Sequence, residues 1–402
     1  MSSRNIISGL PAESKKIFRF VLHKGALTKS SLAELSGLKL TTLNRMMRPL
    51  LNTGLMVQSE IGESTGGRKP VLYAANPIKY YLVGIDISRT YTQAILTNLK
   101  METVEKYRFE MNRESTPEIT VKLILAWIED VNKKLKQENG LIAGIGIGTV
   151  GPLDRGQGIL LNPENFEADG WENVPLKAIF EDRLGISVLM DNGANAAVLA
   201  ETFYGIGKGI RNVIYINCGV GIRTGVISSG VFVRNINDAE DAFAHMVIDV
   251  DGEKCRCGNY GCIERYSSIY SITEEFIAQL KKGKSSMVQK PVEQISYIDI
   301  CKAAEAKDPV AGQVLQNAAV IMGNGLANMI KLLNPGIVVL SGPLIKHSKL
   351  FYQVCTETAL KKSYLNSERN IVFNRGGHFD ENAISIGSAA LVIEHYLDGE
   401  PE

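Results

Sequence analysis

The hydrophobic positions near the N-terminus repeat at the spacing of roughly three to four residues that is typical of an α-helix. One run extends from Ala12 to Lys24, a shorter run follows Thr28, and a third begins after Gly37. Pro49 removes one helical hydrogen bond and disfavours helical geometry at the residue before it, so we expect the third helix to kink or end there. Helices joined by such short turns predict a helix-turn-helix arrangement.

After Gly54 the pattern becomes that of two strands, Leu55–Ile61 and Val71–Ala74, joined by a polar loop. This hairpin would form a wing behind the helices. Its tip carries flexible glycines and two cations, Arg68 and Lys69, which suit DNA phosphates or a narrow minor groove. The first turns of the third helix leave polar side chains on the outer face, where a recognition helix presents hydrogen-bonding groups to base edges: Thr41, Thr42, Asn44 and Arg45.

The charge distribution favours DNA binding by this N-terminal module. The 402 residues include 44 Lys and Arg against 43 Asp and Glu, and the net charge of +1 taken alone argues against affinity for polyanions. Residues 1–70, however, hold 11 basic and four acidic side chains, so they carry +7 and the remainder carries −6. We therefore predict a double-stranded DNA partner. The alternative is a three-helix scaffold with a solvated basic face.

The body of the chain begins after an expected linker at residues 75–79. Strand-like runs there alternate with helical segments, which predicts an α/β body, and glycine-rich turns follow several strands, so we expect a cleft between two lobes. The expected domains are residues 1–75, 80–198 and 199–383. The strand-like runs are Val83–Ile87, Ala143–Gly148, Val188–Met190, Val213–Cys218, Thr224–Ile227 and Ile337–Leu340, and the main helical segments are Ile119–Leu135 and Ala311–Leu333.

Three of the six cysteines crowd into eight positions, and a histidine precedes them: His245, Cys255, Cys257 and Cys262. Three thiols and an imidazole make a tetrahedral Zn²⁺ site, and Gly258 and Gly261 would let the loop return the last cysteine to the first. In a reducing compartment such a cluster indicates a metal rather than disulfides. The alternative is three reduced cysteines in a loop with an unrelated histidine. We predict a structural zinc site.

The chain shows no signal for secretion or for membrane insertion. Nowhere do 18 apolar residues follow one another, and the N-terminus has no apolar run long enough for the core of a signal peptide. The composition, 45% hydrophobic and 22% charged, is typical of a folded protein. We expect a cytoplasmic location and no membrane contact.

The basic winged module and four further segments together resemble the ROK family, whose name joins repressors, open reading frames and kinases. The segments read GIGIGTVGPLD, DNGANAAVLAE, HM with CRCGNYGCIE, and LLNPGIVVLSG, and the resemblance spans essentially the whole chain. Members with a winged helix are typically bacterial sugar-responsive repressors, and members without it are typically sugar kinases. The resemblance implies a two-lobed actin-like ATPase (ribonuclease H-like) sugar-kinase fold of α/β class behind an N-terminal α+β winged helix-turn-helix domain. It also implies that a helix at residues 384–397 packs back on the first lobe.

The resemblance implies where kinase chemistry would lie, and several of those positions are changed here. Family kinases have a general-base aspartate where this chain has Gly193, and Asp191 matches a different position. Arg89 and Arg223 replace glycines of the two phosphate loops, and Ser341 replaces a glycine on the adenosine side. Each change removes something that phosphoryl transfer needs. We therefore predict that the body is catalytically inactive.

The resemblance also implies a sugar site that is only partly kept. The matching residues are Asn192, His245 and Glu264, whereas Ala242 replaces a glutamate three residues before the histidine. Losing that carboxylate should weaken or redirect sugar recognition, although the adjacent Asp241 could partly compensate. A sugar or sugar derivative is the expected effector. For each retained residue the alternative is a structural role, in which it supports the loop of the predicted zinc site and does not contact a ligand.

Two functions from different classes follow. The first is a repressor of genes for carbohydrate uptake or catabolism, in which a ligand moves the DNA-binding modules of a homodimer, or of a dimer of dimers, relative to each other. Such an assembly would bind pseudo-palindromic operators. The second is an ATP-dependent sugar kinase with an appended DNA-binding domain. A third possibility is a ligand-free scaffold that only sets the geometry of the dimer.

Overall fold

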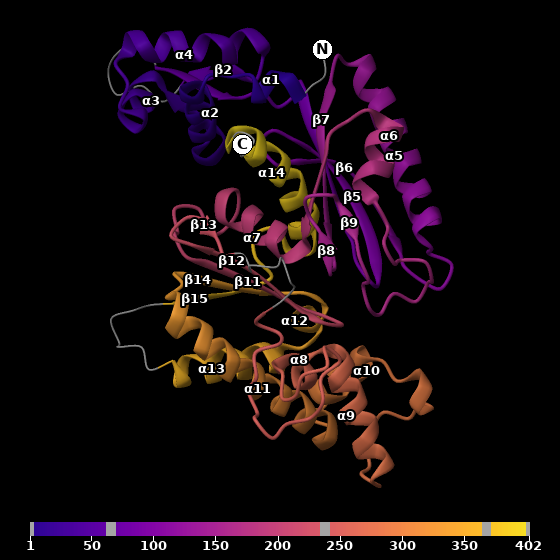
Figure 1. Cartoon of the computed structure of the whole chain (residues 1–402). Helices are drawn as coiled ribbons and strands as arrows, with labels where there is room; N and C mark the ends of the chain where they lie inside the picture. The colour runs from indigo at the N-terminus through magenta and orange to yellow at the C-terminus, as the bar shows by residue number, and fades with distance from the viewer. Residues whose placement is uncertain (1–3, 62–69, 234–241, 364–370, 399–402) are drawn as a thin grey trace. The chain divides into compact units, whose positions relative to one another are not determined.

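A computed structural model describes residues 4–61, 70–233, 242–363 and 371–398 (Figure 1). The chain divides into two compact units, one formed by Met1–Tyr204 with Ile384–Glu402 and the other by Gly205–Ala383. The N-terminal module and the first lobe of the body therefore belong to one unit. The second unit is inserted between the two segments of the first.

Short helices and a three-stranded sheet form the N-terminal module. Thr28 caps α3 by accepting a hydrogen bond from Ser31 N at 3.1 Å, and Gly37 ends that helix in the left-handed conformation. The helices pack through fully buried apolar side chains such as Phe18 and Leu43. The elements are α1 (Arg4–Ser8), α2 (Ala12–Lys24), β1 (Leu27–Thr28), α3 (Lys29–Ser36), α4 (Leu40–Thr53), β2 (Met56–Ile61) and β3 (Val71–Ala75), and the sheet order is β1-β3-β2.

The third predicted helix, α4, does not end at Pro49. It continues to Thr53 and is ended by Gly54, whose φ is 74°. Met47 and Leu50, on either side of the proline, are 1% and 0% exposed. Full burial of two such side chains contributes about 3–6 kcal/mol, which matches or exceeds the roughly 3 kcal/mol that a proline costs inside a helix. Packing against the module core therefore carries the helix past the proline.

The first lobe is built on a five-stranded sheet with the order β10-β7-β4-β5-β6. The neighbours β10, β7 and β4 run parallel, and β5 runs antiparallel to both β4 and β6. One face is covered by α5 and α6, which bury Ile124 and Phe180 against strand residues such as Ile145. The strands β5 and β6 were not predicted. The elements are β4 (Tyr80–Ile87), β5 (Tyr91–Asn98), β6 (Thr103–Glu110), α5 (Pro117–Gln137), β7 (Leu141–Thr149), β8 (Leu153–Asp154), β9 (Ile159–Leu160), α6 (Leu176–Leu184), β10 (Val188–Asn192) and α7 (Gly193–Phe203).

Glycines on the other face of this sheet let the helix α14 (Ala383–Asp398) lie directly against it. A Cβ on Gly84 of β4, or on Gly146 of β7, would collide with a backbone carbonyl of α14. In the same way, a Cβ on Gly387 of α14 would collide with the carbonyl of Ala196 on α7. Only glycine fits at these three positions. The helix α14 is thus fixed against both the sheet and α7.

The second unit contains another five-stranded sheet, with the order β13-β12-β11-β14-β15. Its strand residues Ile216 and Leu340 are buried against helical residues such as Leu315 and Met322. The elements are β11 (Val213–Cys218), β12 (Ile222–Ser228), β13 (Val231–Phe232), α8 (Ile263–Ser267), α9 (Ile269–Lys281), η1 (Val292–Gln294), α10 (Tyr297–Glu305), α11 (Pro309–Leu333), β14 (Ile337–Ser341), α12 (Pro343–His347), α13 (Lys349–Lys362), β15 (Val372–Arg375) and η2 (Asp380–Asn382).

The 25-residue helix α11 is the central helix of the second unit. It begins where Asp308 accepts a hydrogen bond from Ala311 N at 2.8 Å, and it ends where Asn334 adopts a φ of 43°. Many of its residues are buried in the core of the unit, although the helix is amphipathic enough to keep a polar face. Across the described part of the chain, no helix has both the length and the apolar character needed to cross a bilayer.

Candidate metal centre, ligand residues and DNA-binding surface

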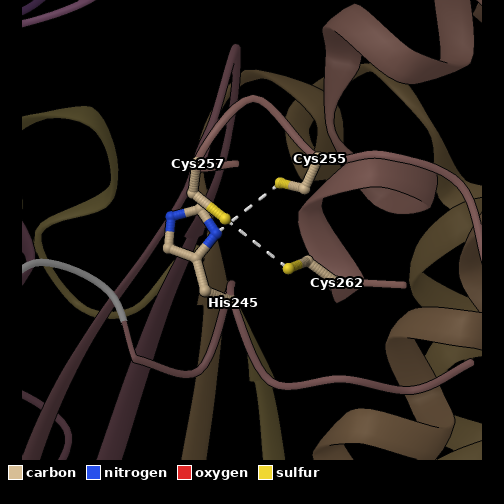
Figure 2. A group of neighbouring side chains, drawn as sticks. All are labelled: His245, Cys255, Cys257 and Cys262. Carbon is tan, nitrogen blue, oxygen red and sulfur yellow. Dashed lines mark hydrogen bonds between the residues drawn. The ribbon is translucent and has the colours of Figure 1, made fainter. Parts of the chain in front are cut away.

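Three thiols and one imidazole meet in the second unit, where Figure 2 shows their side chains directed toward a common centre. The ligand atoms of His245, Cys255, Cys257 and Cys262 all lie within 4.8 Å of one another. Cys255 Sγ is 3.8 Å from His245 Nδ1, and Cys257 Sγ is 3.7 Å from Cys262 Sγ. Cys257 is exposed to solvent, whereas Cys255 and Cys262 are buried. A donor set of this kind could hold a metal ion.

Two glycines shape the loop between Cys255 and Cys262. Gly258 has a φ of 89° and Gly261 a φ of 70°, values that residues with a side chain rarely adopt. A Cβ on Gly261 would also collide with the backbone carbonyl of Asp249, whereas the space around Gly258 is open. The tight backbone at these glycines brings Cys262 back to Cys255.

Burial controls the charge of the thiols. Desolvation raises the pKa of Cys262 to about 12 and also raises the pKa of Cys255. In the absence of a nearby cation both thiols are therefore neutral at pH 7. A metal ion would supply the positive charge that stabilises thiolates, which are the form that coordinates metals.

The histidine of this cluster is tied to the helix that follows the last cysteine. Glu264 N, in the first turn of α8, donates a hydrogen bond to the carbonyl of Ala244 at 2.9 Å. The carboxylate of Glu264 in turn accepts a hydrogen bond from Ile222 N at 2.8 Å. Two of the predicted sugar-binding residues, His245 and Glu264, thus lie on segments that are bonded to each other.

The third predicted sugar-binding residue, Asn192, lies in the first unit at the carboxyl end of β10. Its Oδ1 caps α7 by accepting a hydrogen bond from Ala194 N at 2.9 Å. Asp191 Oδ1 accepts hydrogen bonds from Asn192 N at 2.7 Å and from Asn195 Nδ2 at 2.9 Å. The carboxylate of Asp191 therefore stabilises the start of the same helix, in which Gly193 is the first residue.

The two segments that resemble phosphate loops both carry arginines. Arg89 Nε donates a hydrogen bond to the carbonyl of Glu164 at 2.8 Å. Arg223 pairs with Asn217 across β11 and β12 and is 8% exposed. A guanidinium thus stands in each of these two segments at a position where the family resemblance implies a glycine.

The exposed face of α4 presents most of the predicted base-contacting residues. Thr41, Asn44 and Arg45 are exposed, and Thr42 is half-buried. The buried face of the helix packs on α2, where Ser14 Oγ donates a hydrogen bond to the carbonyl of Met46 at 2.8 Å. The tip of the predicted wing, with Arg68 and Lys69, lies outside the described residues.

One cluster that the sequence did not predict joins the N-terminal module to the first lobe. Glu394 of α14 accepts a hydrogen bond from Tyr204 OH at 2.9 Å, and His23 Nε2 of α2 lies 2.6 Å from the same carboxylate oxygen. Arg19 Nε lies 3.3 Å from the other oxygen. His23 and Glu394 are 371 positions apart in the chain, so no local pattern could have indicated this contact.

Comparison with known proteins gives a match along nearly the whole chain. Residues 82–395 match the ROK family. The xylose repressor of Bacillus subtilis (strain 168) is 28% identical over 386 residues, which cover 96% of this chain and 95% of that protein. The DNA-binding transcriptional dual regulator NagC of Escherichia coli (strain K12) is 25% identical over 394 residues, which cover 96% and 93%.

Solved structures show the same fold. A ROK family transcriptional regulator, described as a homologue of the E. coli MLC protein, has a TM-score of 0.78 at 24% identity and covers 96% of both chains. A ROK family glucokinase from Streptomyces griseus, in complex with glucose and AMPPNP, has a TM-score of 0.64 at 24% identity. It covers 78% of this chain and 100% of its own. These likenesses confirm the predicted actin-like sugar-kinase fold behind an N-terminal module.

Proposed function

Because the chain belongs to the ROK family, we propose that it is a DNA-binding transcriptional regulator that represses genes for carbohydrate uptake or catabolism. The extent of the match carries this proposal. The xylose repressor and NagC are similar to the chain over 96% of its length, which includes most of the N-terminal module. The glucokinase fold spans only 78% of the chain, as expected for a body without that module.

We assign DNA recognition to the N-terminal helix-turn-helix and its wing. The residues proposed to contact bases are Thr41, Thr42, Asn44 and Arg45, and those proposed to contact phosphates or the minor groove are Arg68 and Lys69. The helix α4 contains no acidic residue, so its exposed face does not repel phosphates. Because a regulator of this kind acts on the chromosome, we propose a cytoplasmic location.

We assign a structural Zn²⁺ to the cluster of His245 and the three cysteines. Zinc bound tetrahedrally at about 2.3 Å places two sulfur ligands about 3.8 Å apart. The sulfurs of Cys257 and Cys262 are 3.7 Å apart, which fits this geometry. Four protein ligands leave no open coordination position, so the ion would fix the loop rather than catalyse a reaction. Chelation is expected to lower the thermal stability of the protein, and elemental analysis should find about one zinc per chain.

We infer a sugar or sugar derivative as the effector. Asn192 offers an amide NH₂ group as donor, Glu264 offers a carboxylate as acceptor, and His245 offers its second ring nitrogen. A ligand that binds the folded protein must raise its apparent stability. Thermal unfolding with D-xylose, N-acetyl-D-glucosamine and D-glucose is expected to identify at least one stabilising sugar. No change with any hexose, pentose or N-acetylhexosamine would favour the ligand-free scaffold.

We propose that the body performs no phosphoryl transfer. Gly193 has no side chain that could deprotonate a sugar hydroxyl, and positioned general bases contribute about 10²–10⁴-fold to such reactions. Asp191 is engaged by Asn195 at the start of α7, which supports a structural role for that carboxylate. A coupled assay of ADP release is expected to stay at background with all common sugars. Turnover above background would establish the alternative, a kinase with an appended DNA-binding domain.

Capture of genomic DNA tests the regulator directly. Fragmented DNA from the source organism is retained by the purified protein at near-physiological salt and then sequenced. A homodimer, or a dimer of dimers, with two-fold symmetry should retain discrete fragments that contain inverted repeats near transport or sugar-catabolism genes. Uniform retention that declines steeply with salt would show only nonspecific charge binding and would contradict the proposal.

A further inference from the structure

The carboxylate of Glu394 lies where three helical segments of the first unit meet. Glu394 is 7% exposed, and its two oxygens are shared by residues of α2 and by the residue that follows α7. Tyr204 OH donates to Oε1 at 2.9 Å, His23 Nε2 lies 2.6 Å from Oε1, and Arg19 Nε lies 3.3 Å from Oε2. Figure 1 shows this end of α14, near the label C, beside α2. The cluster fastens the DNA-binding module to the body.

The ring of His23 adds packing to this polar contact. It stacks on Phe203 with the ring centroids 4.6 Å apart and an angle of 13° between the planes. The edge of Tyr204 meets the same ring at 5.5 Å and 89°. Arg19 also pairs with Asp398, one turn further along α14. The module is thus held by both the end of α7 and the last turn of α14.

The protonation states of two buried groups, Tyr204 and Glu394, favour this contact between the module and the body. Desolvation strongly raises the pKa of Tyr204, so its hydroxyl remains a donor at neutral pH. Burial also opposes ionisation of Glu394, but the hydrogen bond and charge of His23, the charge of Arg19 and the hydroxyl of Tyr204 outweigh it and lower its pKa. The carboxylate is therefore charged at neutral pH and can hold all three partners.

The helix α7 connects this cluster to Asn192. It begins at the cap formed by Asn192, and Phe203 and Tyr204 stand at its other end. Nine of its eleven residues are buried. A helix of this length spans about 16 Å as a single hydrogen-bonded rod. Because its Ala196 touches Gly387 backbone to backbone, α7 cannot slide along α14 without separating from it.

We propose that α7 and α14 form a lever that couples the occupancy of Asn192 to the position of the DNA-binding module, with Glu394 and Tyr204 as the positioning residues that join α2 to the lever. This inference rests on the proposed function, because it takes Asn192 as a ligand contact. A ligand that binds better to one position of the lever shifts the population of the module toward that position. By linkage, operator DNA must shift the affinity for the ligand by the same factor.

The test measures coupling without sugar or DNA, by hydrogen exchange of the backbone amides in α2. Asn192→Ala removes the cap of α7 at the far end of the lever and is expected to speed exchange in α2 about fivefold, as for the loss of a typical cap. Tyr204→Phe deletes only the hydroxyl that joins α7 to Glu394 and leaves the contact between His23 and Glu394. In the Tyr204→Phe background, Asn192→Ala is expected to have a clearly smaller effect on exchange in α2, because only the stacking of His23 on Phe203 and the contact of α7 with α14 remain.

The double-mutant cycle decides the outcome. Equal effects of Asn192→Ala in both backgrounds, or no effect on α2 in either, would overturn the lever. Glu394→Gln, which keeps the size and one acceptor of the side chain, serves as a second uncoupling variant should Tyr204→Phe perturb the fold. Glu129→Gln is the matched control, because it neutralises a carboxylate paired with Arg183 elsewhere in the same unit. The effects of Glu129→Gln and Asn192→Ala on exchange in α2 should be additive.

Operator binding separates this inference from the proposed function. Captured DNA fragments are titrated with the protein, with and without D-xylose or another stabilising sugar. If the sugar changes the affinity for DNA, Tyr204→Phe should bring the ratio of the affinities with and without sugar toward one. An unchanged ratio would contradict the lever while leaving the regulator intact. A failure to capture any discrete DNA fragment would contradict the regulator, whereas the exchange experiment would still decide whether α7 communicates with α2.

Discussion

Gly261 and Gly258 show how strongly the loop between Cys255 and Cys262 depends on single backbone positions. Both have a positive φ, but only at Gly261 would a methyl group meet another part of the backbone, the carbonyl of Asp249. Both sites therefore share the strain of the left-handed conformation, whereas the collision occurs only at Gly261. A comparison of alanine variants at the two positions separates the cost of strain from the cost of displacing the loop.

Gly261→Ala is expected to lower the metal content of the purified protein and its stability more than Gly258→Ala does. The left-handed conformation alone costs roughly 1–2 kcal/mol for a residue with a side chain, and this is all that Gly258→Ala should lose. Elemental analysis and thermal unfolding of both variants provide the measurement. Equal metal content and equal stability would show that the loop can shift away from Asp249 at no cost.

Arg45→Ala is expected to weaken specific operator binding by roughly 5–150-fold, the 1–3 kcal/mol of a good base contact, without changing the melting temperature. The control is Lys24→Ala, which removes the same charge from an exposed position at the end of α2. Titrations of captured operator and of unrelated DNA compare the two. If both variants lose the same affinity for both DNAs, Arg45 contributes charge and not sequence recognition.

Among the elements of the first unit, the helix α14 is held by close backbone contacts on two sides. It lies against the sheet at Gly84 and Gly146, and it lies against α7 at Gly387, so glycine contacts replace the side-chain packing that usually separates two such elements. Close approach fixes the position of the helix along its axis. This position in turn sets where Glu394 meets α2.

Gly146→Ala is expected to destabilise the protein by about 1–3 kcal/mol or more, because the new methyl group would have to displace the backbone of α14. Gly312→Ala is the contrast, since it lies in the helix α11 with open space around it. It should stabilise the protein by about 0.5–1 kcal/mol. Denaturant unfolding measures both. A neutral Gly146→Ala variant would mean that α14 is not held at this position.

The sequence predicted elements well where the signal was local. Thr28 caps the helix that was predicted to follow it, and α11 begins at Pro309, two residues before the predicted start at Ala311. The strand β5 could not be predicted in this way, because Thr92, Gln93 and Thr97 are polar and yet fully buried. Such a strand shows neither the alternation of a half-buried strand nor the apolar run of a buried one.

The same distinction applies to the candidate sites. The cluster of His245 with the three cysteines could be predicted because its members lie close together in the chain and cysteine spacing is specific. The contact of His23 with Glu394 depends on the path of the whole chain through the second unit and back. No pattern of residue types around either position distinguishes it from an ordinary surface position of a helix.

At the scale of the whole molecule, the pKa of Glu394 predicts how the first unit responds to acid. Because the folded state lowers this pKa, its contribution to stability is complete above the unfolded value of about 4.3 and is lost as the pH falls through the lower folded value. The difference in free energy of unfolding between the natural protein and Glu394→Gln should therefore shrink with acidification below pH 4.3. A constant difference across that range would show that the charge of Glu394 is not what matters.

The insertion of the second unit between the two segments of the first has a consequence for biosynthesis. While a ribosome translates Gly205–Ala383, the sheet face around Gly84 and Gly146 has no covering helix, and the nascent first unit exposes it to chaperones and proteases. The N-terminal module emerges first, but Glu394, which anchors it, is translated only afterwards. Chains released early from the ribosome would thus carry an unanchored N-terminal module beside an uncovered sheet, and proteases would be expected to degrade them.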